Sequence, residues 1–208
     1  EWMDSGAERV ATWDYYFGAP YIYTRQFTRW IGESLGFLAE AGVDVFFSQL
    51  PAFWGLDGPK AWLATQLLWD PSQNTEDLLD EFYKNFFGAA SGAVRSFYEL
   101  AESHRDANEG TAEWIKLYRD EAGIALFTSE VLSEMRDYID EAERLVAGDA
   151  RWLARVNVVS KAFALTETYA EYDFARRRLV ELCLSEEPVE TIEAGLGVFR
   201  AARTAFLR

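Results

Sequence analysis

The sequence predicts a mainly α-helical protein in which a short parallel α/β segment, residues 1–70, precedes a helical domain, residues 71–208. Two β-prone runs separated by a helical pattern indicate the α/β segment. Helix-period apolar stripes over the rest of the chain indicate the helical domain. The aromatic residues are also unevenly distributed, because residues 1–70 hold 16 of the 33 aromatics and six of the eight tryptophans.

The first predicted strand is followed by an irregular stretch and then by a helix. Val10–Trp13 is a β-prone run, and Gly18 and Pro20 mark the irregular stretch behind it. Apolar residues then recur at spacings of three and four over Thr24–Ala41, which predicts a helix. Gly42 is placed to end that helix in a left-handed conformation.

The second strand is predicted over Val43–Phe47, which is apolar except for Asp44. A run of this kind is typical of a strand buried on both faces, and it favours a parallel sheet. A loop over Pro51–Pro59 and a helix over Lys60–Trp69 follow. Strand, helix, strand, helix is the order of a right-handed crossover unit.

Two parallel strands cannot form a stable sheet alone, because their outer edges would present unpaired backbone N–H and C=O groups. We therefore expect either further strands upstream or another chain covering the edges. The first residue is Glu1 rather than Met, and no signal-peptide pattern follows it, so the start is expected to be a cut.

The helical domain starts after Pro71, with Asn74 or Thr75 as a cap and Gly88 as the end of its first helix. Gly148 closes a later helix, and Asp149 caps a long one that runs to about Ser185. The apolar stripes that indicate a bundle core are Leu78, Leu79, Phe82 and Phe86, then Ala90, Val94, Phe97 and Ala101, then Val131, Met135, Tyr138, Ala142 and Leu145, then Trp152, Val156, Val159 and Phe163, and finally Val189, Ile192, Leu196, Phe199 and Phe206 behind Pro188.

Charge and hydropathy exclude two partner classes. The net charge of −15 argues against nucleic acid, which requires clustered Lys and Arg. Arg176–Arg178 is the one basic cluster, and its acidic flanks predict a solvated helix face. A membrane partner is not expected either, since no stretch approaches about 18 consecutive apolar residues.

The counts of histidine and cysteine narrow the chemistry. One histidine, His104, makes a multi-histidine metal site impossible, and its charged surroundings predict an exposed helix end. One cysteine, Cys183, excludes an internal disulfide, and its leucine neighbours predict a buried thiol. No phosphate loop, dinucleotide fingerprint or metal motif is present.

The predicted functional surface is the set of loops after the two strands, because ligands of α/β folds gather at the carboxyl ends of strands. Aromatic rings beside short polar groups suit sugars, whose C–H groups face the ring while their hydroxyls need hydrogen-bonding partners. The candidate substrate-binding residues are Trp13, Tyr15, Tyr16, Gln49 and Trp54. The same aromatics could instead fill a core, and core packing is the interpretation for Trp62 and Trp69.

Asp14 is the candidate catalytic residue, because a carboxylate at a strand end among aromatics can have a raised pKa. A capping role in the loop is the alternative. Glycoside hydrolysis normally uses two carboxyl groups, about 5 Å apart for retention or 6.5–9.5 Å for inversion. No second strand-end carboxylate is evident, and Asp57 between Gly55 and Gly58 is interpreted as a turn residue.

The stretch Ala61–Pro71, which ends Leu-Leu-Trp-Asp-Pro, is followed by Leu78–Phe82 and by the aromatic-Gly-Ala-Ala step at Phe87–Ala90. This pattern, with Trp13 and its Tyr-rich loop upstream, resembles the bacterial domain of unknown function 4838 family over about residues 10–105. That family is similar to α-glucuronidases and β-hexosaminidases with a (β/α)8 barrel.

The resemblance implies that the two strands are the last ones of such a barrel, followed by a C-terminal helical bundle. It also implies that the ligand is a carbohydrate and that there is no cofactor. We expect a carboxy-terminal portion of a glycoside hydrolase that is inactive without the missing barrel portion. The alternative is a non-catalytic carbohydrate-binding or helical interaction module. The sequence leaves the compartment open, and the resemblance favours a secreted or periplasmic one.

Overall fold

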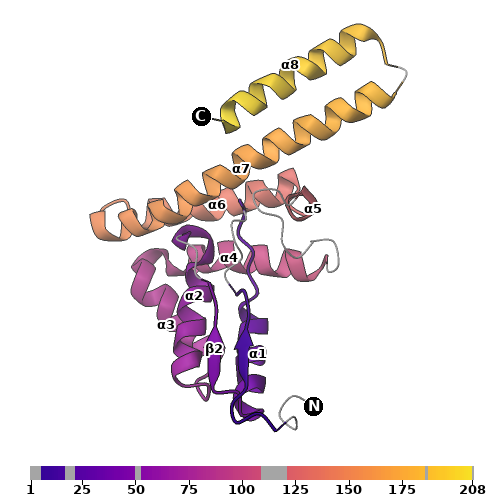
Figure 1. The fold of residues 1–208 in the computed structure, drawn as a ribbon. Coiled ribbons are helices and arrows are strands. Elements are labelled where there is room, and N and C mark those ends of the chain that lie inside the picture. Colours follow the sequence, from indigo (N-terminus) through magenta and orange to yellow (C-terminus); the bar gives the residue numbers. More distant parts are fainter. Residues whose placement is uncertain (1–5, 17–21, 50–52, 109–120, 186, 208) are drawn as a thin grey trace.

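The computed structural model describes residues 6–16, 22–49, 53–108, 121–185 and 187–207. The described part of the chain is mainly helical, with two short parallel strands at its start (Figure 1). In chain order the elements are β1 (Ala11–Trp13), α1 (Thr28–Glu40), β2 (Val45–Phe47), α2 (Trp54–Trp69), α3 (Thr75–Phe87), η1 (Gly88–Ala90), α4 (Ser91–Asp106), α5 (Glu121–Ile124), α6 (Ser129–Leu145), α7 (Ala150–Leu184) and α8 (Val189–Phe206).

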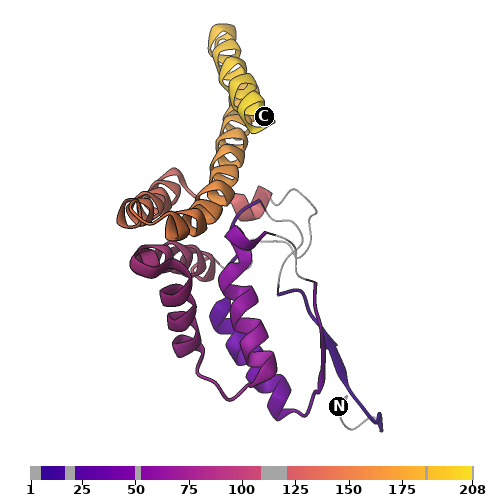
Figure 2. The same ribbon diagram turned by 90° about the vertical axis from the view of Figure 1, so that its left-hand side faces the viewer.

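The two strands pair in parallel, as predicted, with Ala11 opposite Val45 and Trp13 opposite Phe47. Both are shorter than predicted, since Val10 and Val43 lie outside them. Helices α1 and α2 lie on one side of the strands, and no described helix or strand covers the other side (Figure 2). The prediction that the second strand is buried on both faces is therefore wrong for this chain, in which Phe47 is 53% exposed.

Helix α1 begins at Thr28 rather than at the predicted Thr24. The preceding residues form a buried loop, in which the Thr24 hydroxyl donates to the Leu56 carbonyl at 3.0 Å. This bond ties the loop to α2 and keeps it out of the helix. Gly42 has a φ of 79°, so the helix ends at the glycine that the sequence indicated.

Helix α2 begins at Trp54, so the predicted loop over Pro51–Pro59 is wrong for residues 54–59, while residues 50–52 lie outside the described part. Pro59 lies inside the helix and has no N–H to donate to the Gly55 carbonyl. The Tyr98 hydroxyl of α4 donates to that carbonyl instead, at 2.7 Å. A side chain distant in sequence thus satisfies the helical acceptor that proline leaves open.

Local capping chemistry places the next helices where the sequence predicted them. The Asn74 side chain accepts hydrogen bonds from the backbone N–H groups of Glu76 and Asp77 at the start of α3. Gly88 ends α3 with a φ of 57°. The Asp149 carboxylate caps α7 in the same way.

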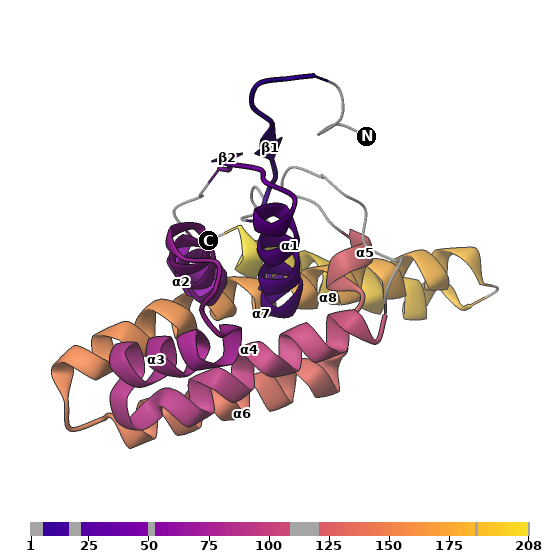
Figure 3. The same cartoon turned by 90° about the horizontal axis from the view of Figure 1, so that it is seen from below.

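The helical part is a bundle in which α4 lies beside α6, and α6 lies beside α7 (Figure 3). The predicted stripe of α4 is confirmed, because Ala90, Val94, Phe97 and Ala101 are all fully buried. The C-terminal half of α7 and all of α8 form a helical hairpin that extends away from the rest of the molecule (Figure 1). No described residue of α8 is buried.

One hydrophobic core runs through both predicted domains, from Tyr16 before α1 to Ala170 in α7. Residue 70 lies in the connection between α2 and α3, and both helices contribute to this core. The core is thus continuous across residue 70, and the division of the chain into two domains at that residue remains a prediction. None of the described helices has both the length and the apolar character needed to cross a bilayer.

Three single-residue expectations are corrected. Cys183 is exposed rather than buried, since it lies on the projecting part of α7. Trp69 is 89% exposed at the last turn of α2, so it does not pack in the core, whereas Trp62 is half-buried and donates to the Leu78 carbonyl at 3.3 Å. His104 is only half-exposed, because its ring contacts the carbonyl of Leu126.

The basic cluster is also less solvated than predicted. Arg176 and Arg177 both form ion pairs with Asp173, at 2.8 and 2.5 Å, and the Asp173 side chain is 1% exposed. Arg178 forms an exposed pair with Glu181 at 3.3 Å. Two of the three cations therefore neutralise a buried carboxylate.

Candidate functional site

The strands end side by side at the carboxyl edge of the pair. Trp13 is in register with Phe47, and the backbone N–H of Asp14 donates to the Phe47 carbonyl at 3.1 Å. This bond extends the parallel ladder by one residue and holds Asp14 at the carboxyl end of the two strands. Ser48 and Gln49 follow β2 at the same edge, where Gln49 is exposed.

Side chains alternate between the two faces of the strands. Phe46 points toward the helices, where its ring lies 5.1 Å from that of buried Tyr16. Trp13 and Phe47 point the other way and are 63% and 53% exposed. The exposed aromatics therefore lie on the face of the strands that α1 and α2 do not cover.

Trp13, Tyr15 and Phe47 form a continuous aromatic surface, which we call the aromatic edge. The Trp13 and Phe47 rings meet edge to face, with centroids 4.9 Å apart and planes at 75°. The centroid of the Tyr15 ring lies 6.0 Å from that of Trp13, with the planes at 43°. A contiguous exposed apolar patch can mark a binding surface.

Asp14 lies beside the aromatic edge and is half-buried. One of its carboxylate oxygens, Oδ1, accepts a hydrogen bond from the backbone N–H of Tyr15 at 2.6 Å. This bond is the loop-capping contact that the sequence left open for Asp14. The contact orients the carboxylate, and it is compatible with a further acceptor role for Oδ2.

Tyr16 is separated from the surface formed by its neighbours. Its side chain is fully buried against Trp30 and Phe46, and its hydroxyl forms a 2.9 Å hydrogen bond with Ser34. Burial raises the pKa of Tyr16 to about 12, an effect opposed by the Ser34 hydrogen bond and reinforced by the charge of Asp14. Tyr16 thus supports the aromatic edge from below as a neutral core residue.

Trp54 is the first residue of α2 and is 37% exposed. Its ring packs against Phe82 and Phe86 of α3, with centroid distances of 6.3 and 5.8 Å. The structure therefore brings Trp13, Asp14 and Tyr15 together at the strand ends and places Trp54 against α3. The assignment of these side chains and Gln49 to substrate binding remains a prediction.

Sequence reasoning missed a buried ion pair at the start of α2. Asp57, which was interpreted as a turn residue, lies in the helix with 6% exposure, and its Oδ1 is 2.5 Å from the Nζ of fully buried Lys60. The ammonium of Lys60 also lies 4.5 Å from the centre of the Phe27 ring. The Asp-x-x-Lys spacing, which places both groups on one helix face, was the available signal.

The contacts around Asp57 and Lys60 indicate that the ion pair has a structural role. Burial lowers the pKa of Lys60, while the charge and hydrogen bond of Asp57 oppose that shift and the nearby Arg25 and Arg105 reinforce it. Arg105 donates to the Gln26 carbonyl at 3.1 Å. The cluster joins α2, α4 and the loop before α1 beneath the strand ends.

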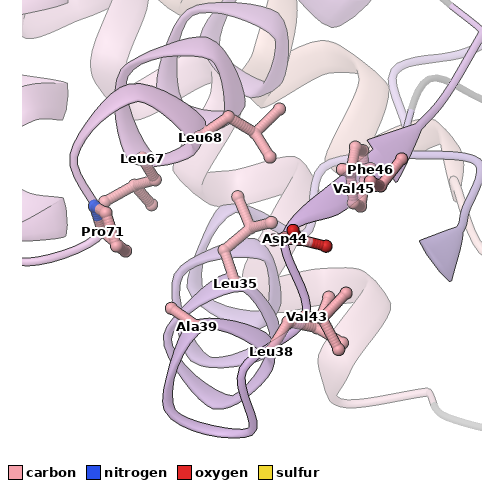
Figure 4. A pocket seen from close by; sticks show the side chains of 10 residues that line it. All are labelled: Leu35, Leu38, Ala39, Val43, Asp44, Val45, Phe46, Leu67, Leu68 and Pro71. Atoms are coloured by element: carbon pink, nitrogen blue, oxygen red, sulfur yellow. The ribbon is translucent and has the colours of Figure 1, made fainter. Parts of the chain in front are cut away.

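A separate apolar groove of about 370 Å³ lies along β2 (Figure 4). Its walls come from β2 and from the C-terminal halves of α1 and α2, and they include Leu35, Leu38, Val45, Phe46 and Leu67. Asp44, which also lines the groove, is paired with Arg9, whose Nε lies 3.0 Å from its Oδ2. Most of the side chains that line the groove are apolar, so it could receive another apolar element.

No group of three or more His, Cys, Asp or Glu side chains could hold a metal ion in the part of the chain that the structure describes.

A family model matches the part of the chain that contains this site. Residues 1–99 match the Domain of unknown function (DUF4838) model. The DUF4838 match includes both strands, the aromatic edge, α1 to α3 and most of α4, whereas α5 to α8 lie outside it. Neither a curated protein nor a solved structure matches the chain significantly.

Proposed function

We propose that this chain supplies the closing strand–helix units and the helical support of a carbohydrate-active (β/α)8 barrel of the glycoside hydrolase type. The observation that carries the proposal is the aromatic edge beside Asp14, which lies at the carboxyl end of two parallel strands. Enzymes with parallel barrels bind their substrates at that end.

The two faces of the strands support a barrel. In a barrel, one face of each strand packs on helices and the other faces the interior. Here Thr12 and Phe46 are the half-buried residues on the helix side, while Trp13, Val45 and Phe47 are exposed on the other. The exposed set would face the interior once further strands closed the sheet, with Trp13 at its carboxyl end.

The groove in Figure 4 supports the same arrangement. A helix of a (β/α)8 barrel packs over its own strand and the next one. Helix α2 covers β2, and the groove between them exposes Leu38, Leu68 and Val45 at the position where a further strand would lie. The missing barrel portion, or another chain that covers this edge, is the partner that we propose.

The chemistry of the aromatic edge suits a sugar. The exposed ring of Trp13 and the half-buried ring of Tyr15 can stack on the C–H groups of a pyranose, and the Asp14 carboxylate can accept hydrogen bonds from its hydroxyls. Charge-assisted hydrogen bonds of this type are stronger than neutral ones. Each stacking contact should contribute about 1 kcal/mol, which is the magnitude typical of contacts between aromatic rings.

The proposal is tested by calorimetric titration of the chain with a panel of oligosaccharides. The substitution Trp13→Ala should weaken binding of a recognised sugar by about fivefold, since it removes one stacking contact at the central ring of the edge. Trp69→Ala is the matched control, because Trp69 is 89% exposed on the last turn of α2. Equal affinities of the two variants would remove the aromatic edge from the binding site.

A non-catalytic carbohydrate-binding role is the second candidate, and one observation favours it. Asp14 is the sole carboxylate in residues 14–27 and 48–53, the two segments that follow the strands. Hydrolysis needs a second carboxyl group, which the remaining barrel strands would have to provide. Asp14→Asn in the protein with a complete barrel separates the two roles. If the variant loses glycan cleavage but still binds the glycan, Asp14 is catalytic. If the parent protein itself binds the glycan without cleaving it, the binding role is favoured.

A further inference from the structure

The helical hairpin formed by α7 and α8 carries a surface that the proposed function does not use. Helix α8 packs along the C-terminal half of α7 through aromatic contacts, with the Tyr172 and Phe199 rings 5.6 Å apart and the Tyr169 and Phe206 rings 5.4 Å apart. None of the described α8 residues is buried. The hairpin extends away from the body of the molecule (Figure 2), so both of its sides are accessible.

An open apolar groove of about 710 Å³ runs along one side of the hairpin. Helix α7 contributes Phe174 and Ala175, and α8 contributes Val198, Ala201, Ala202 and Ala205. Val198 is 63% exposed, although a valine at this spacing would normally face a core. The alanines leave room for another helix to approach closely, as small residues do in helix–helix interfaces.

The charged groups of the groove are arranged symmetrically along α7. Glu171 and Arg178 line the groove seven residues apart, and Phe174 and Ala175 lie midway between them. An antiparallel copy of α7 related by a two-fold axis at this midpoint would place Glu171 opposite Arg178 of the partner subunit. The same pairing would form a second time on the other side of the axis. A surface that complements itself in this way is the requirement for a two-fold dimer.

Net charge also favours association at the hairpin. Residues 161–207 hold six Lys and Arg residues and eight Asp and Glu residues, whereas the whole chain holds 20 and 35. Two copies of this acidic chain repel one another over most of their surface. The hairpin is close to neutral, so it is a part of the molecule where that repulsion is small.

We propose that a second copy of this chain docks in the groove, with the two α7 helices antiparallel and the two hairpins forming a four-helix bundle. Phe174 lies at the centre of this interface, against the alanines of α8 and the partner's α7. Glu171 and Arg178 form the reciprocal ion pairs at its margins. Antiparallel four-helix packing of this kind buries apolar stripes that a lone hairpin leaves in water.

Sedimentation velocity of the full 208-residue chain over a range of concentrations tests the proposal. The parent chain should sediment as a monomer–dimer equilibrium. Glu171→Arg and Arg178→Glu should each raise the dissociation constant by about tenfold or more, because each replaces two attractive pairs with two repulsive ones. The double variant E171R/R178E should restore the parent value, which a purely structural role of either residue would not do.

Two control variants complete the experiment. Glu193→Arg changes the charge by the same amount at an exposed position of α8 outside the groove, and it should leave the equilibrium unchanged. Trp13→Lys tests association through the strands and should also leave it unchanged. A monomeric parent chain, a double variant as weak as the single ones, or a dimer lost with Trp13→Lys but kept with Glu171→Arg would each overturn the proposal.

Discussion

The hydroxyl of Tyr98 donates a hydrogen bond to the carbonyl of Gly55, the helical acceptor that Pro59 leaves without a backbone donor. Burial raises the pKa of Tyr98, so the hydroxyl stays protonated and continues to donate at ordinary pH. This contact allows α2 to begin at Trp54 and thereby positions the buried start of the helix beneath the strand ends.

Tyr98→Phe should lower the free energy of unfolding by about 1–3 kcal/mol, because it leaves a buried carbonyl without a partner while keeping the ring. Urea denaturation monitored by circular dichroism measures the change. Tyr138→Phe is the control, since Tyr138 donates to Glu134 on an exposed helix face. Equal stability of the two variants would show that the Gly55 carbonyl does not depend on Tyr98.

Asp57→Asn should destabilise the fold by about 3–5 kcal/mol, because it leaves the ammonium of Lys60 buried without its anion. The double variant D57N/K60M should recover most of that loss, since it removes both buried charges. The four proteins of this cycle can be compared by chemical denaturation. A double variant as unstable as D57N alone would contradict the importance of the pair.

The lowered pKa of Lys60 also predicts a pH dependence. Between that lowered value and the ordinary value of 10.5, the unfolded chain binds more protons than the folded chain, so this group makes stability rise with pH. The difference in unfolding free energy between the parent chain and Lys60→Met should therefore increase with pH on the alkaline side. Buried tyrosines affect both proteins alike and cancel in the difference. A difference that stays flat up to pH 10.5 would disprove the assignment.

Glu102 caps α1 from another helix. Its two carboxylate oxygens accept from the Thr28 hydroxyl at 2.5 Å and from the Arg29 backbone N–H at 3.1 Å, while the N-cap residue Phe27 provides no side-chain hydrogen bond. Glu102→Ala should cost about 1–3 kcal/mol of stability, measured by thermal or urea unfolding. Glu40→Ala, at the exposed last position of α1, should change stability by less than about 0.5 kcal/mol.

Sequence reasoning succeeded where short-range chemistry decides the structure. The ends and caps at Gly42, Asn74, Gly88 and Asp149 depend on side chains or glycine conformations within a few residues, so they could be read directly. The parallel pairing of the strands followed from their apolar runs and the intervening helix.

The errors arose where distant residues override local preference. Gly55, Gly58 and Pro59 indicate a loop on their own, and a helix forms because Tyr98, 43 residues away, supplies the missing donor. The sequence likewise grouped Tyr16 with Tyr15, although contacts with Trp30 and Phe46 bury one ring and leave the other at the surface. Positions of Trp13 and Asp14 at a strand end were predictable, because they depend only on where β1 stops.

Amide hydrogen exchange at β1 and β2 tests the barrel proposal most directly. It compares this chain with a longer polypeptide that carries the further strand–helix units that the proposal requires. The account predicts that the amides of Ala11–Trp13 and Val45–Phe47 exchange rapidly in the 208-residue chain and slow by about 100-fold or more when neighbouring strands cover the edges and the face bearing Trp13. Equal exchange rates in the two proteins would show that these strands have no such neighbours and would contradict the barrel.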